Sequence, residues 1–510
     1  MSTLTIIWIA LPFFLGFVIY LVPKLDRYLS LGVALVSAGY AAFLFAEKSP
    51  IELQLLNNFG VILIADQLSA FFILTNALVT AAVIFYCWNM GKKTFFYTQA
   101  IILHGSINAA FVCADFISLY VALEVLGIAA FLLIAYPRTD RSIWVGLRYL
   151  FVSNVALLFY LMGAILVYQA HHSFSFAGLR GAPPEALALI FLGLLTKGGI
   201  FVSGLWLPLT HSESETPVSA LMSGVVVKAG VYPLVRCALM VEEVDPIVRV
   251  FGVGTALLGV FYAVFEKDTK RMLAFHTISQ LGFILAAPVV GGFYALTHGL
   301  VKSTLFFIAG ALPSRSFKEL QHQPISTPLW IALVIASFSI SGFPLLSGFG
   351  AKVLTTKNLL PWQAIVMNVA ALGTAISFAK FIFLPRERTG NKTKELEETL
   401  ANVKGKSLAQ IPFSPPSPHP SSVGFWAAVI LLIGGLVIAN VVYYEAYTLE
   451  NIIKPLLTIG IGWLAYLLIF KHLVVKLPRA IERFEHLIGV MTLILVFLFW
   501  KGFAWLGISI

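Results

Sequence analysis

Five lysines lie inside long apolar runs of this 510-residue chain, whereas the other basic residues lie in or beside polar segments. They are Lys197, Lys228, Lys302, Lys352 and Lys380. An ammonium group at bilayer depth costs roughly 2.5–3.5 kcal/mol on insertion scales, so it is retained where it is paired or lines a hydrated path. Because lysines can bind and release protons, their repetition indicates a buried path for protons.

A counter-charge for the first of these lysines is available in the run LYVALEVLGIAAFLLIAY. Glu124 is the only acidic residue inside that run. A carboxylate near Lys197 at low dielectric holds the lysine proton in place, so moving or neutralising Glu124 would let Lys197 release the proton toward Lys228. The alternative is a static ion pair that only fixes helix packing. Asp115, at the mouth of the same helix, is either a solvated helix end or a group through which protons reach the row.

A second titratable pair lies in GGFYALTHGLVKSTLFFIAGAL. His298 and Lys302 are spaced i, i+4, so they share one face of a helix. A histidine changes its charge near neutral pH, and together with the lysine it would extend the row of titratable groups. The alternative is an ordinary buried histidine that serves only packing.

Two further polar features have weaker assignments. The segment THSESETP holds His211 and Glu213, which would form either a cytoplasmic funnel for protons or cations or an acidic loop without a role. Lys380 lies close before Pro385, where a lysine at a helix end can extend its ammonium group to the membrane surface.

Two of the lysines lie next to residues that break helices. Lys197 is followed directly by Gly198–Gly199, and Gly342, Pro344, Gly348 and Gly350 precede Lys352. Proline removes a main-chain hydrogen bond and glycine allows a helix to unwind. Paired interrupted helices in corresponding positions of two halves are typical of inverted-repeat transporters. The alternative is a simple kink at each place.

The bulk composition agrees with a membrane protein. Hydrophobic residues make up 59% of the chain, charged residues only 11%, and the mean hydropathy is +0.91. Because a span needs about 20 mainly apolar residues, the sequence predicts an all-α polytopic membrane protein with about sixteen transmembrane helices. The predicted helices are 4–22, 28–46, 67–89, 96–113, 115–136, 147–169, 186–207, 217–240, 247–265, 271–290, 292–312, 327–350, 361–384, 424–444, 453–470 and 487–508. Residues 50–66 are predicted to form a short extracytoplasmic hairpin.

The charge distribution predicts the orientation. With this helix count, most lysines and arginines fall in loops on one side, so the positive-inside rule places both termini on the extracytoplasmic side. The formal charge of +10 does not indicate nucleic-acid binding, because the basic residues form no single polar face. Three scattered cysteines without metal-ligand spacing argue against zinc or iron–sulfur binding, so no cofactor is expected. The first apolar run lacks the features of a cleavable signal and is predicted to be the first span.

Several motifs together resemble the antiporter-like membrane subunits shared by respiratory complex I and the multisubunit Mrp-type Na+/H+ antiporters. They are LYVALEVLGIAAFLLIAY, LTKGGIFVSGLWLP, TPVSALMSGVVVKAGVYPLVR, KDTKRMLAFHTISQLGF, LTHGLVKSTLFFIAG and SGFPLLSGFGAKVL, in this order within about residues 66–385. The resemblance implies that a central hydrophilic axis runs through Glu124, Lys197, Lys228, His298, Lys302 and Lys352.

The resemblance also implies a domain plan with an inverted repeat of two five-helix units, interrupted around Lys197 and at Gly342–Lys352. Residues 1–95 would form N-terminal helices, 96–240 and 241–385 two antiporter-like halves, 386–423 a cytoplasmic polar and Pro-rich loop, and 424–510 a C-terminal transmembrane extension. Family members differ at two places: a tryptophan often stands where this chain has Leu123, and some have a second histidine where it has Tyr294.

The lysine at position 352 favours an MrpD-like subunit of a Na+/H+ antiporter. The helices after residue 450 exceed the core expected for such a subunit, and long C-terminal additions occur in the complex I relatives. A proton-translocating membrane-arm subunit of an NAD(P)H- or ferredoxin-quinone oxidoreductase is therefore the alternative, without a redox site in this chain. Either role implies other subunits as partners and a bacterial plasma membrane or a thylakoid membrane as location. A purely structural scaffold is the third reading, and the central charges oppose it.

Overall fold

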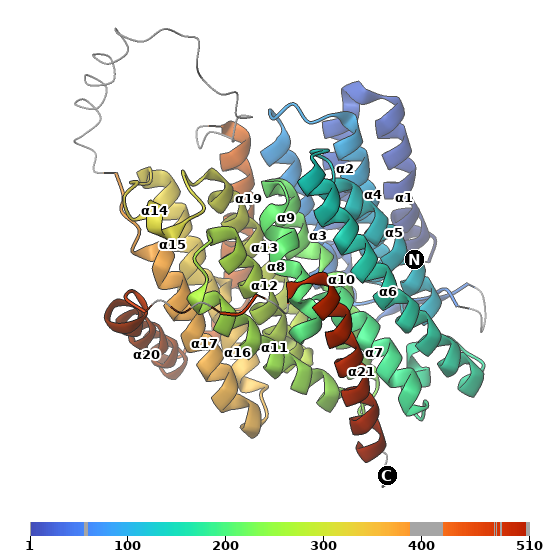
Figure 1. The fold of residues 1–510 in the computed structure, drawn as a ribbon. Coiled ribbons are helices and arrows are strands. Elements are labelled where there is room, and N and C mark those ends of the chain that lie inside the picture. Colours follow the sequence, from blue (N-terminus) through green and yellow to red (C-terminus); the bar gives the residue numbers. More distant parts are fainter. Residues whose placement is uncertain are drawn as a thin grey trace.

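The chain is almost entirely helical in the computed structural model, which describes residues 2–55, 60–387, 422–473, 475, 477–479 and 482–505 (Figure 1). The helices of the first half are α1 Ser2–Leu21, α2 Asp26–Ala46, α3 Gln67–Cys87, α4 Thr94–Ala110, α5 Phe116–Ile134, α6 Asp140–His171, α7 Pro184–Gly198, α8 Leu207–Glu213, α9 Thr216–Leu221 and α10 Lys228–Met240. Those that follow are α11 Asp245–Phe265, α12 Thr269–Ala286, α13 Gly291–Ala311, α14 Phe317–Leu320, α15 Thr327–Ser341, α16 Ser347–Lys357, α17 Pro361–Ile382, α19 Val423–Val442, α20 Leu449–Ala465 and α21 Phe484–Trp505.

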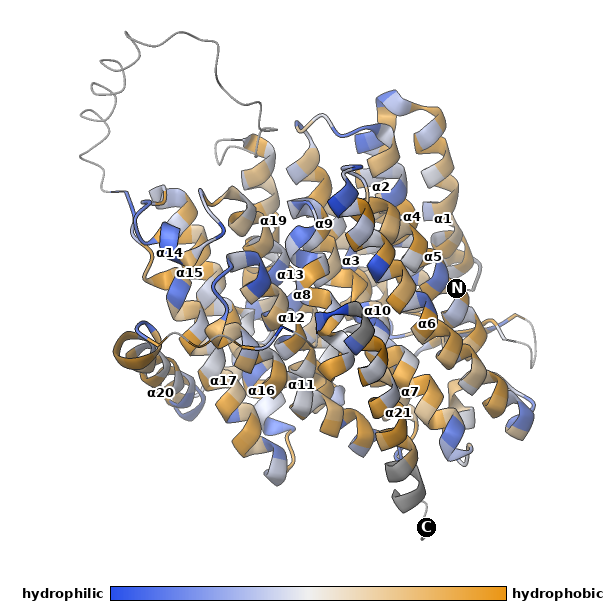
Figure 2. Cartoon of the chain, viewed as in Figure 1, coloured by the Kyte–Doolittle hydropathy of each residue, from blue (hydrophilic) through white to orange (hydrophobic). Residues whose placement is uncertain are grey.

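Shorter turns join several of these helices. The 3₁₀ turns are η1 Pro23–Leu25, η3 Phe176–Leu179, η4 Phe201–Trp206, η6 Pro288–Val290 and η7 Tyr444–Ala446, and the π turns are η5 Met222–Val226 and η8 Tyr466–Phe470. Apolar side chains cover the outer surfaces of the helices, while polar residues concentrate near helix ends (Figure 2).

Eleven helices of the described residues are long and apolar enough to cross a membrane, or twelve if the bent pair α12–α13 counts as one span. The chain is therefore an integral membrane protein, but the predicted number of sixteen spans is not confirmed. The difference has identifiable causes. Helix α4 has only 17 residues, and the predicted span 327–350 is divided into α15 and α16 by a break. A hydropathy window counts apolar residues and does not register where the helix stops.

The predicted hairpin is present. Strands β1 Ile51–Gln54 and β2 Ile62–Ala65 pair antiparallel, with Ile51 opposite Ala65. The hairpin is attached to the bundle by Asp115, whose carboxylate accepts a hydrogen bond of 2.8 Å from the Ile62 amide. Among the described residues this is the only sheet.

Helices α10, α12 and α13 form the centre of the bundle. Every residue of α12 is buried, and α13 exposes little more than its last turn. Helix α12 turns into α13 through a bend of 109° beside Pro288. Because these helices are surrounded by protein, the polar side chains they carry face other helices rather than acyl chains.

The C-terminal segment crosses the bundle instead of adding one more hairpin at its edge. Helix α20 packs against α17, and α21 packs against α7 and η4 on the other half of the chain (Figure 1). Between them residues 471–483 run over the bundle; this segment is called the strap here, and its described residues are 471–473, 475, 477–479 and 482–483. The predicted polar and Pro-rich loop, 386–423, lies almost wholly outside the described residues.

The strap is held by ion pairs. The Arg479 guanidinium lies 3.2 Å from the Glu266 carboxylate, which follows α11, and the Glu482 carboxylate lies 2.7 Å from Arg271 in the first turn of α12. Arg148 of α6 also donates to the Glu482 carbonyl oxygen. Two residues of the strap thus connect it to both halves of the bundle.

Candidate functional site

Lys197 lies in the last turn of α7, buried between α5 and α6. Its Nζ donates to the Ser153 hydroxyl at 2.5 Å and to the Leu123 carbonyl oxygen at 3.1 Å. The ring of Tyr149 lies 5.7 Å from the same ammonium group. A Cβ on Gly127 would lie 3.2 Å from Nζ, so the glycine leaves the space that the lysine head occupies.

Glu124 lies one residue after the carbonyl group that Lys197 contacts. The carboxylate is near enough to act on the lysine charge, yet no ion pair joins the two in the described part of the chain. Glu124 is half-buried, at the outer edge of α5, and Val121 and Ile128 on the same face are 55% and 52% exposed. The predicted pair is therefore brought together, but not in direct contact.

The break predicted after Lys197 is present. Helix α7 stops at Gly199, whose φ of 71° lies in the left-handed region that glycine tolerates, and the 3₁₀ turn η4 follows. The indole of Trp206 donates to the Thr196 carbonyl oxygen at 2.8 Å, which satisfies one of the main-chain groups that the break leaves without a helical partner. Lys197 is thereby held at a helix end rather than inside a continuous helix.

Lys228 lies at the start of α10, directly after the π turn η5. Its Nζ donates to the carbonyl oxygens of Ser223 and Gly224, the first at 3.4 Å. A Cβ on Gly299 would lie 3.5 Å from this ammonium group, so Lys228 also faces α13 one residue away from His298. Pi turns are rare in proteins, and those that occur often lie at functional sites.

His298 and Lys302 share one face of α13, as the spacing predicts. Both residues are buried, and no described residue hydrogen-bonds either ring nitrogen of His298. Lys302 Nζ donates to the Leu273 carbonyl oxygen in α12 and lies 5.3 Å from the Phe306 ring. The charges of Lys228 and Lys302 both act on His298, so the histidine lies near both lysines.

The second predicted break lies between α15 and α16. Helix α15 ends at Gly342, with φ 85°, and α16 begins at Ser347 and carries Lys352. Lys352 Nζ donates to the Ser341 carbonyl oxygen at 3.1 Å and lies 5.5 Å from the Phe283 ring of α12. The lysine after the break therefore reaches back to the last residue before it. Whether the two interrupted regions belong to an inverted repeat, and the division into domains, remain predictions.

His276 is a buried residue of the same region that the sequence analysis did not select. It lies in the middle of α12 and packs on Phe378, with ring centroids 4.7 Å apart. The charges of Lys302, Lys380 and Lys352 all act on its ring. The available signal was a histidine inside an apolar run, in the motif KDTKRMLAFHTISQLGF.

Lys380 is buried instead of reaching the membrane surface. Its Nζ donates to the carbonyl oxygens of Ala263 and Glu266, at 3.2 and 2.8 Å. Both carbonyl groups lie at the C-terminal end of α11, where a positive charge is favourable. Lys380 caps a helix end, so the prediction that its ammonium group extends to the membrane surface is wrong.

The three candidate access groups lie in different surroundings. Asp115 is fully buried at the N-terminus of α5, where its carboxylate also accepts from the Ser118 amide at 2.7 Å. His211 is buried in α8 and its ring lies 6.0 Å from that of Phe306, beside Lys302. Glu213 pairs with Arg141 at 3.3 Å and lines a charged cavity. A role of these groups in proton access remains a prediction.

These contacts connect five helices in one row. The row passes from α7 to α10, where a Cβ on Gly230 would collide with the main chain of Gly198, and on to α13, α12 and α16. Among the described residues there is no group of three or more histidine, cysteine, aspartate or glutamate side chains that could hold a metal ion. The row consists of basic side chains that donate to main-chain carbonyl oxygens.

A sequence profile of the family described as NADH:quinone oxidoreductase/Mrp antiporter, transmembrane, matches residues 113–377. The chain is 27% identical to the D-subunit of the Na+/H+ antiporter of Alkalihalophilus pseudofirmus over 394 residues, which is 69% of this chain and 80% of the relative. It is 33% identical to the N-subunit of the NADH-quinone oxidoreductase of Desulforudis audaxviator over 320 residues, 56% of this chain and 64% of the relative.

Two solved structures have a similar fold. A chain of an archaeal respiratory membrane complex, the membrane-bound sulfane sulfur reductase, superposes with a TM-score of 0.71 at 20% identity and covers 91% of this chain and 99% of its own. A chain of the Mrp complex from Dietzia sp. superposes with a TM-score of 0.69 at 21% identity, covering 96% and 99%. At these identities the likeness concerns the fold alone.

Proposed function

Because the chain belongs to the NADH:quinone oxidoreductase/Mrp antiporter transmembrane family, we propose that it is a proton-conducting, antiporter-like subunit of a membrane complex. The first assignment is an MrpD-like subunit that takes part in Na+/H+ antiport. Relatives named as antiporter subunits support this assignment. The partners would be the other subunits of that hetero-oligomer.

The observation that carries the proposal is the buried row of basic groups. Lys197, Lys228, Lys302 and Lys352 each donate to a main-chain carbonyl oxygen, and none makes an ion pair with a described residue. A carbonyl oxygen accepts a hydrogen bond from either the charged or the neutral amine. A proton can therefore leave one lysine without stranding a partner carboxylate in the protein interior.

In this mechanism Glu124 regulates the proton affinity of Lys197. Its carboxylate favours the charged form of Lys197, and its loss, by protonation or by movement, favours release of that proton toward Lys228. His298 lies near both Lys228 and Lys302 and can accept and donate a proton within the row. The carbonyl groups freed at Gly199 and Gly342 are oxygen ligands of the kind that Na+ takes.

The alternative assignment is a membrane-arm subunit of a complex I-type oxidoreductase. It is favoured by the 33% identity to an oxidoreductase N-subunit and by the C-terminal helices α20 and α21. In that role the driving force arrives from neighbouring subunits, because no metal-binding group was found among the described residues. The residue-level mechanism is the same in both assignments.

The test is transport by the intact complex, purified with its partner subunits and reconstituted into liposomes containing a pH-sensitive dye. Glu124→Ala and Lys197→Ala should each lower the rate of proton movement at least tenfold, with subunit composition unchanged on gel filtration. Full transport in either variant would refute both assignments.

The same preparation separates the two assignments. A response to a Na+ pulse, together with small Mrp-type subunits in the purified complex, supports the antiporter. Copurified subunits with iron–sulfur signals support the oxidoreductase. The proposal places the chain in a bacterial plasma membrane, or in a thylakoid membrane, with both termini on the extracytoplasmic side. Cysteine labelling at the two ends of the chain tests that orientation.

A further inference from the structure

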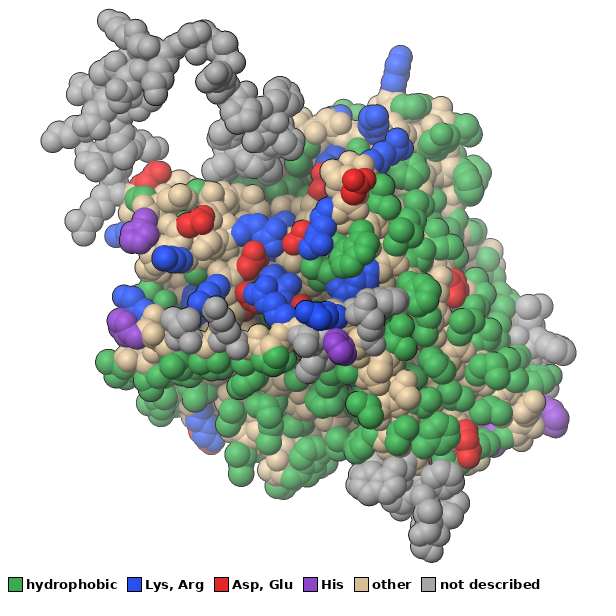
Figure 3. Space-filling view, in the orientation of Figure 1, with side chains coloured by type: hydrophobic (Ala, Val, Ile, Leu, Met, Phe, Trp, Pro, Cys, Tyr) green, Lys and Arg blue, Asp and Glu red, His purple; other side chains and the backbone are tan. Residues whose placement is uncertain are grey.

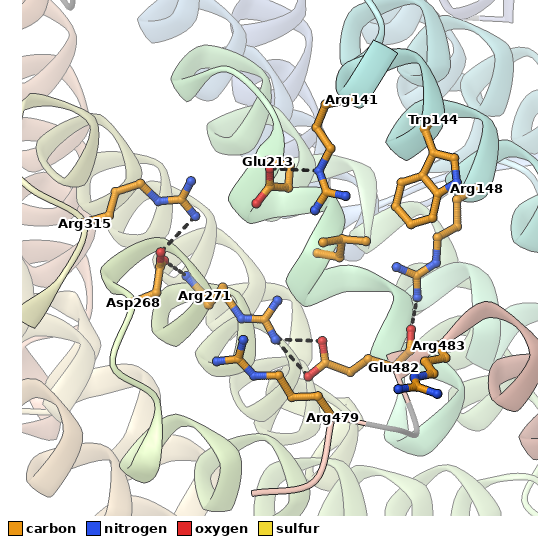
Figure 4. A pocket seen from close by; sticks show the side chains of 11 residues that line it. Arg141, Trp144, Arg148, Glu213, Asp268, Arg271, Arg315, Arg479, Glu482 and Arg483 are labelled. Carbon is orange, nitrogen blue, oxygen red and sulfur yellow. Dashed lines mark hydrogen bonds and ion pairs between the residues drawn. The ribbon is translucent and has the colours of Figure 1, made fainter. Parts of the chain in front are cut away.

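A charged cavity of about 750 Å³ lies beneath the strap (Figure 4). Its walls come from the first turns of α6, the end of α8, the start of α12, the segment after α13, and the strap. Figure 3 shows basic and acidic side chains gathered around this part of the surface, above a band of hydrophobic side chains. The cavity therefore forms where five separate segments of the chain meet.

The lining has an excess of positive charge. It contains three carboxylates and six arginines, and we call it the arginine pocket. The arginines are Arg141, Arg148, Arg271, Arg315, Arg479 and Arg483. Counting Glu266 of the adjoining cavity as well still leaves two positive charges unbalanced.

The acidic residues of the pocket are already engaged. Glu213 pairs with Arg141 at 3.3 Å, Asp268 with Arg315 at 3.0 Å, and Glu482 with Arg271 at 2.7 Å. Arg315 is still 42% exposed in its side chain, so one edge of its guanidinium faces the pocket (Figure 4). Arg483 is exposed on the strap and makes no ion pair in the described part of the chain. Donors are therefore left over for a ligand.

The depth of the pocket matches the head-group region of a bilayer. Helix α6 has 32 residues and is about 48 Å long, which exceeds the hydrocarbon thickness of about 30 Å. One or both ends of α6 therefore extend beyond the hydrocarbon, and Arg141 and Arg148 in its first turns favour the N-terminal end. Trp144 of the same turns is 49% exposed, as is usual for tryptophan at a membrane–water interface.

A second cavity, of about 480 Å³, adjoins the arginine pocket through Arg479 and Glu482. One wall of it is apolar and is formed by Tyr262 and Phe265 of α11 and Leu477 of the strap. A molecule with a charged head and an apolar body could thus occupy both spaces.

We propose that the arginine pocket binds the phosphate group of an anionic ligand. Guanidinium groups bind phosphate oxygens through paired hydrogen bonds, and basic pockets between transmembrane helices bind acidic lipid head groups. The head-group depth and the adjoining apolar wall favour the head group of an acidic phospholipid as the source, and free phosphate is the other source with the same chemistry. Bound there, the phosphate connects the strap to α6 and α12.

The test is native mass spectrometry of the full complex, titrated separately with phosphatidylglycerol, phosphatidylcholine and inorganic phosphate. The complex should retain phosphatidylglycerol in preference to phosphatidylcholine. Arg315→Gln combined with Arg483→Gln should weaken that retention roughly tenfold or more, since each basic residue near the surface adds about a factor of five. The corresponding double substitution to lysine keeps the charge but loses the paired guanidinium hydrogen bonds, so its retention should lie between that of the parent and that of the glutamine variant.

Arg138→Gln is the matched control, because Arg138 is exposed on the loop before α6 and does not line the pocket. Retention of inorganic phosphate with the same arginine dependence also supports the pocket and assigns a soluble source. Equal binding of both lipids by parent and double variant, with no phosphate retained, overturns the proposal. If the double variant fails to assemble, Arg483→Gln alone decides the same comparison, because Arg483 has no ion pair to lose in the described part of the chain.

Discussion

All five lysines of the apolar runs use the same kind of acceptor, a main-chain carbonyl oxygen. For Lys228 and Lys352 the acceptor lies at an irregular part of the backbone, whereas Lys197 uses a carbonyl oxygen inside the regular helix α5. Lys380 uses the end of α11. A neutral acceptor stabilises an ammonium group less than a carboxylate does, so the proton is easier to remove. Whether one of these lysines can pass its proton on then depends on whether another titratable group lies near it.

Lys228 and Lys380 provide a direct comparison of these two situations. Lys228→Met should lower proton transport at least tenfold with little effect on assembly, because it removes a step next to His298 and Lys302. Lys380→Met should leave transport nearly intact but lower the free energy of unfolding by about 1–3 kcal/mol, because two buried carbonyl groups lose a charged donor. Transport assays and thermal unfolding of the two variants check this; loss of transport in Lys380→Met would show that the cap is part of the path.

The lowered pKa of the Glu266 carboxyl predicts that the stability of the fold depends on pH. Burial raises the pKa of this carboxyl, but Arg271, the Lys267 amide and Arg479 outweigh burial and hold the pKa below its usual value. A lowered pKa in the folded state means that the stabilisation is complete above the unfolded value of about 4.3 and is lost as the pH falls through the folded value. Thermal unfolding between pH 6 and pH 3 should show a fall that is smaller in Glu266→Gln. Parallel curves for the two proteins would contradict this assignment.

At the scale of elements, the sequence predicted those features that have a local signal. The breaks after Lys197 and before Lys352 follow from glycines next to buried charges, and the hairpin follows from a short strand-like segment between spans. The π turn η5 could not be predicted, because Met222–Val226 is an apolar stretch that fits any helix type. The carbonyl partners of the lysines could not be predicted either. Side-chain identity does not indicate which main-chain carbonyl groups remain available as hydrogen-bond acceptors in the fold.

The helix number was wrong because hydropathy does not distinguish a continuous span from two pieces. The strap was missed because residues 471–483 lack any periodic pattern, and its partners Glu266 and Arg271 lie more than 200 residues earlier in the chain. His276 was passed over although it lay in a recognised motif, since a lone histidine in an apolar run is usually a packing residue.

Close contact between α7 and α10 yields a prediction at the same scale. Gly230→Ala would push a Cβ against the main chain of Gly198 and separate the two helices that carry Lys197 and Lys228. We expect a loss of about 1–3 kcal/mol in unfolding free energy and slower proton transport. Gly460→Ala is the control, because a Cβ there meets no atom within 4 Å. Thermal unfolding and liposome transport of both variants provide the measurement, and equal behaviour would disprove tight packing at this crossing.

At the scale of the whole molecule, the strap connects two halves that are otherwise joined through the central helices. Glu482→Gln should release it partly. Breaking an isolated buried ion pair costs about 3–5 kcal/mol, but Glu266 still contacts Arg271, so about 1–3 kcal/mol is expected here. The readout is faster tryptic cleavage within residues 471–483. Glu450→Gln, which affects an exposed pair with Lys454, should leave the cleavage rate unchanged.

The flank of the fold beside Glu124 contrasts with the flank that α21 covers. Helix α21 covers α7 and η4, whereas the flank beside Glu124 carries exposed Val121 and Ile128 and no covering helix among the described residues. A carboxyl group facing acyl chains is costly, so we expect another subunit to lie against this flank.

In a newly inserted subunit without its partners, the carboxyl group of Glu124 would remain exposed to lipid. Membrane proteases and chaperones could recognise this exposed polar group. In a pulse-chase experiment without the partner genes, Glu124→Leu should lengthen the lifetime of the orphan chain, while Glu450→Gln should not. Glu124, which regulates the lysine row, would then also set the lifetime of the unassembled subunit.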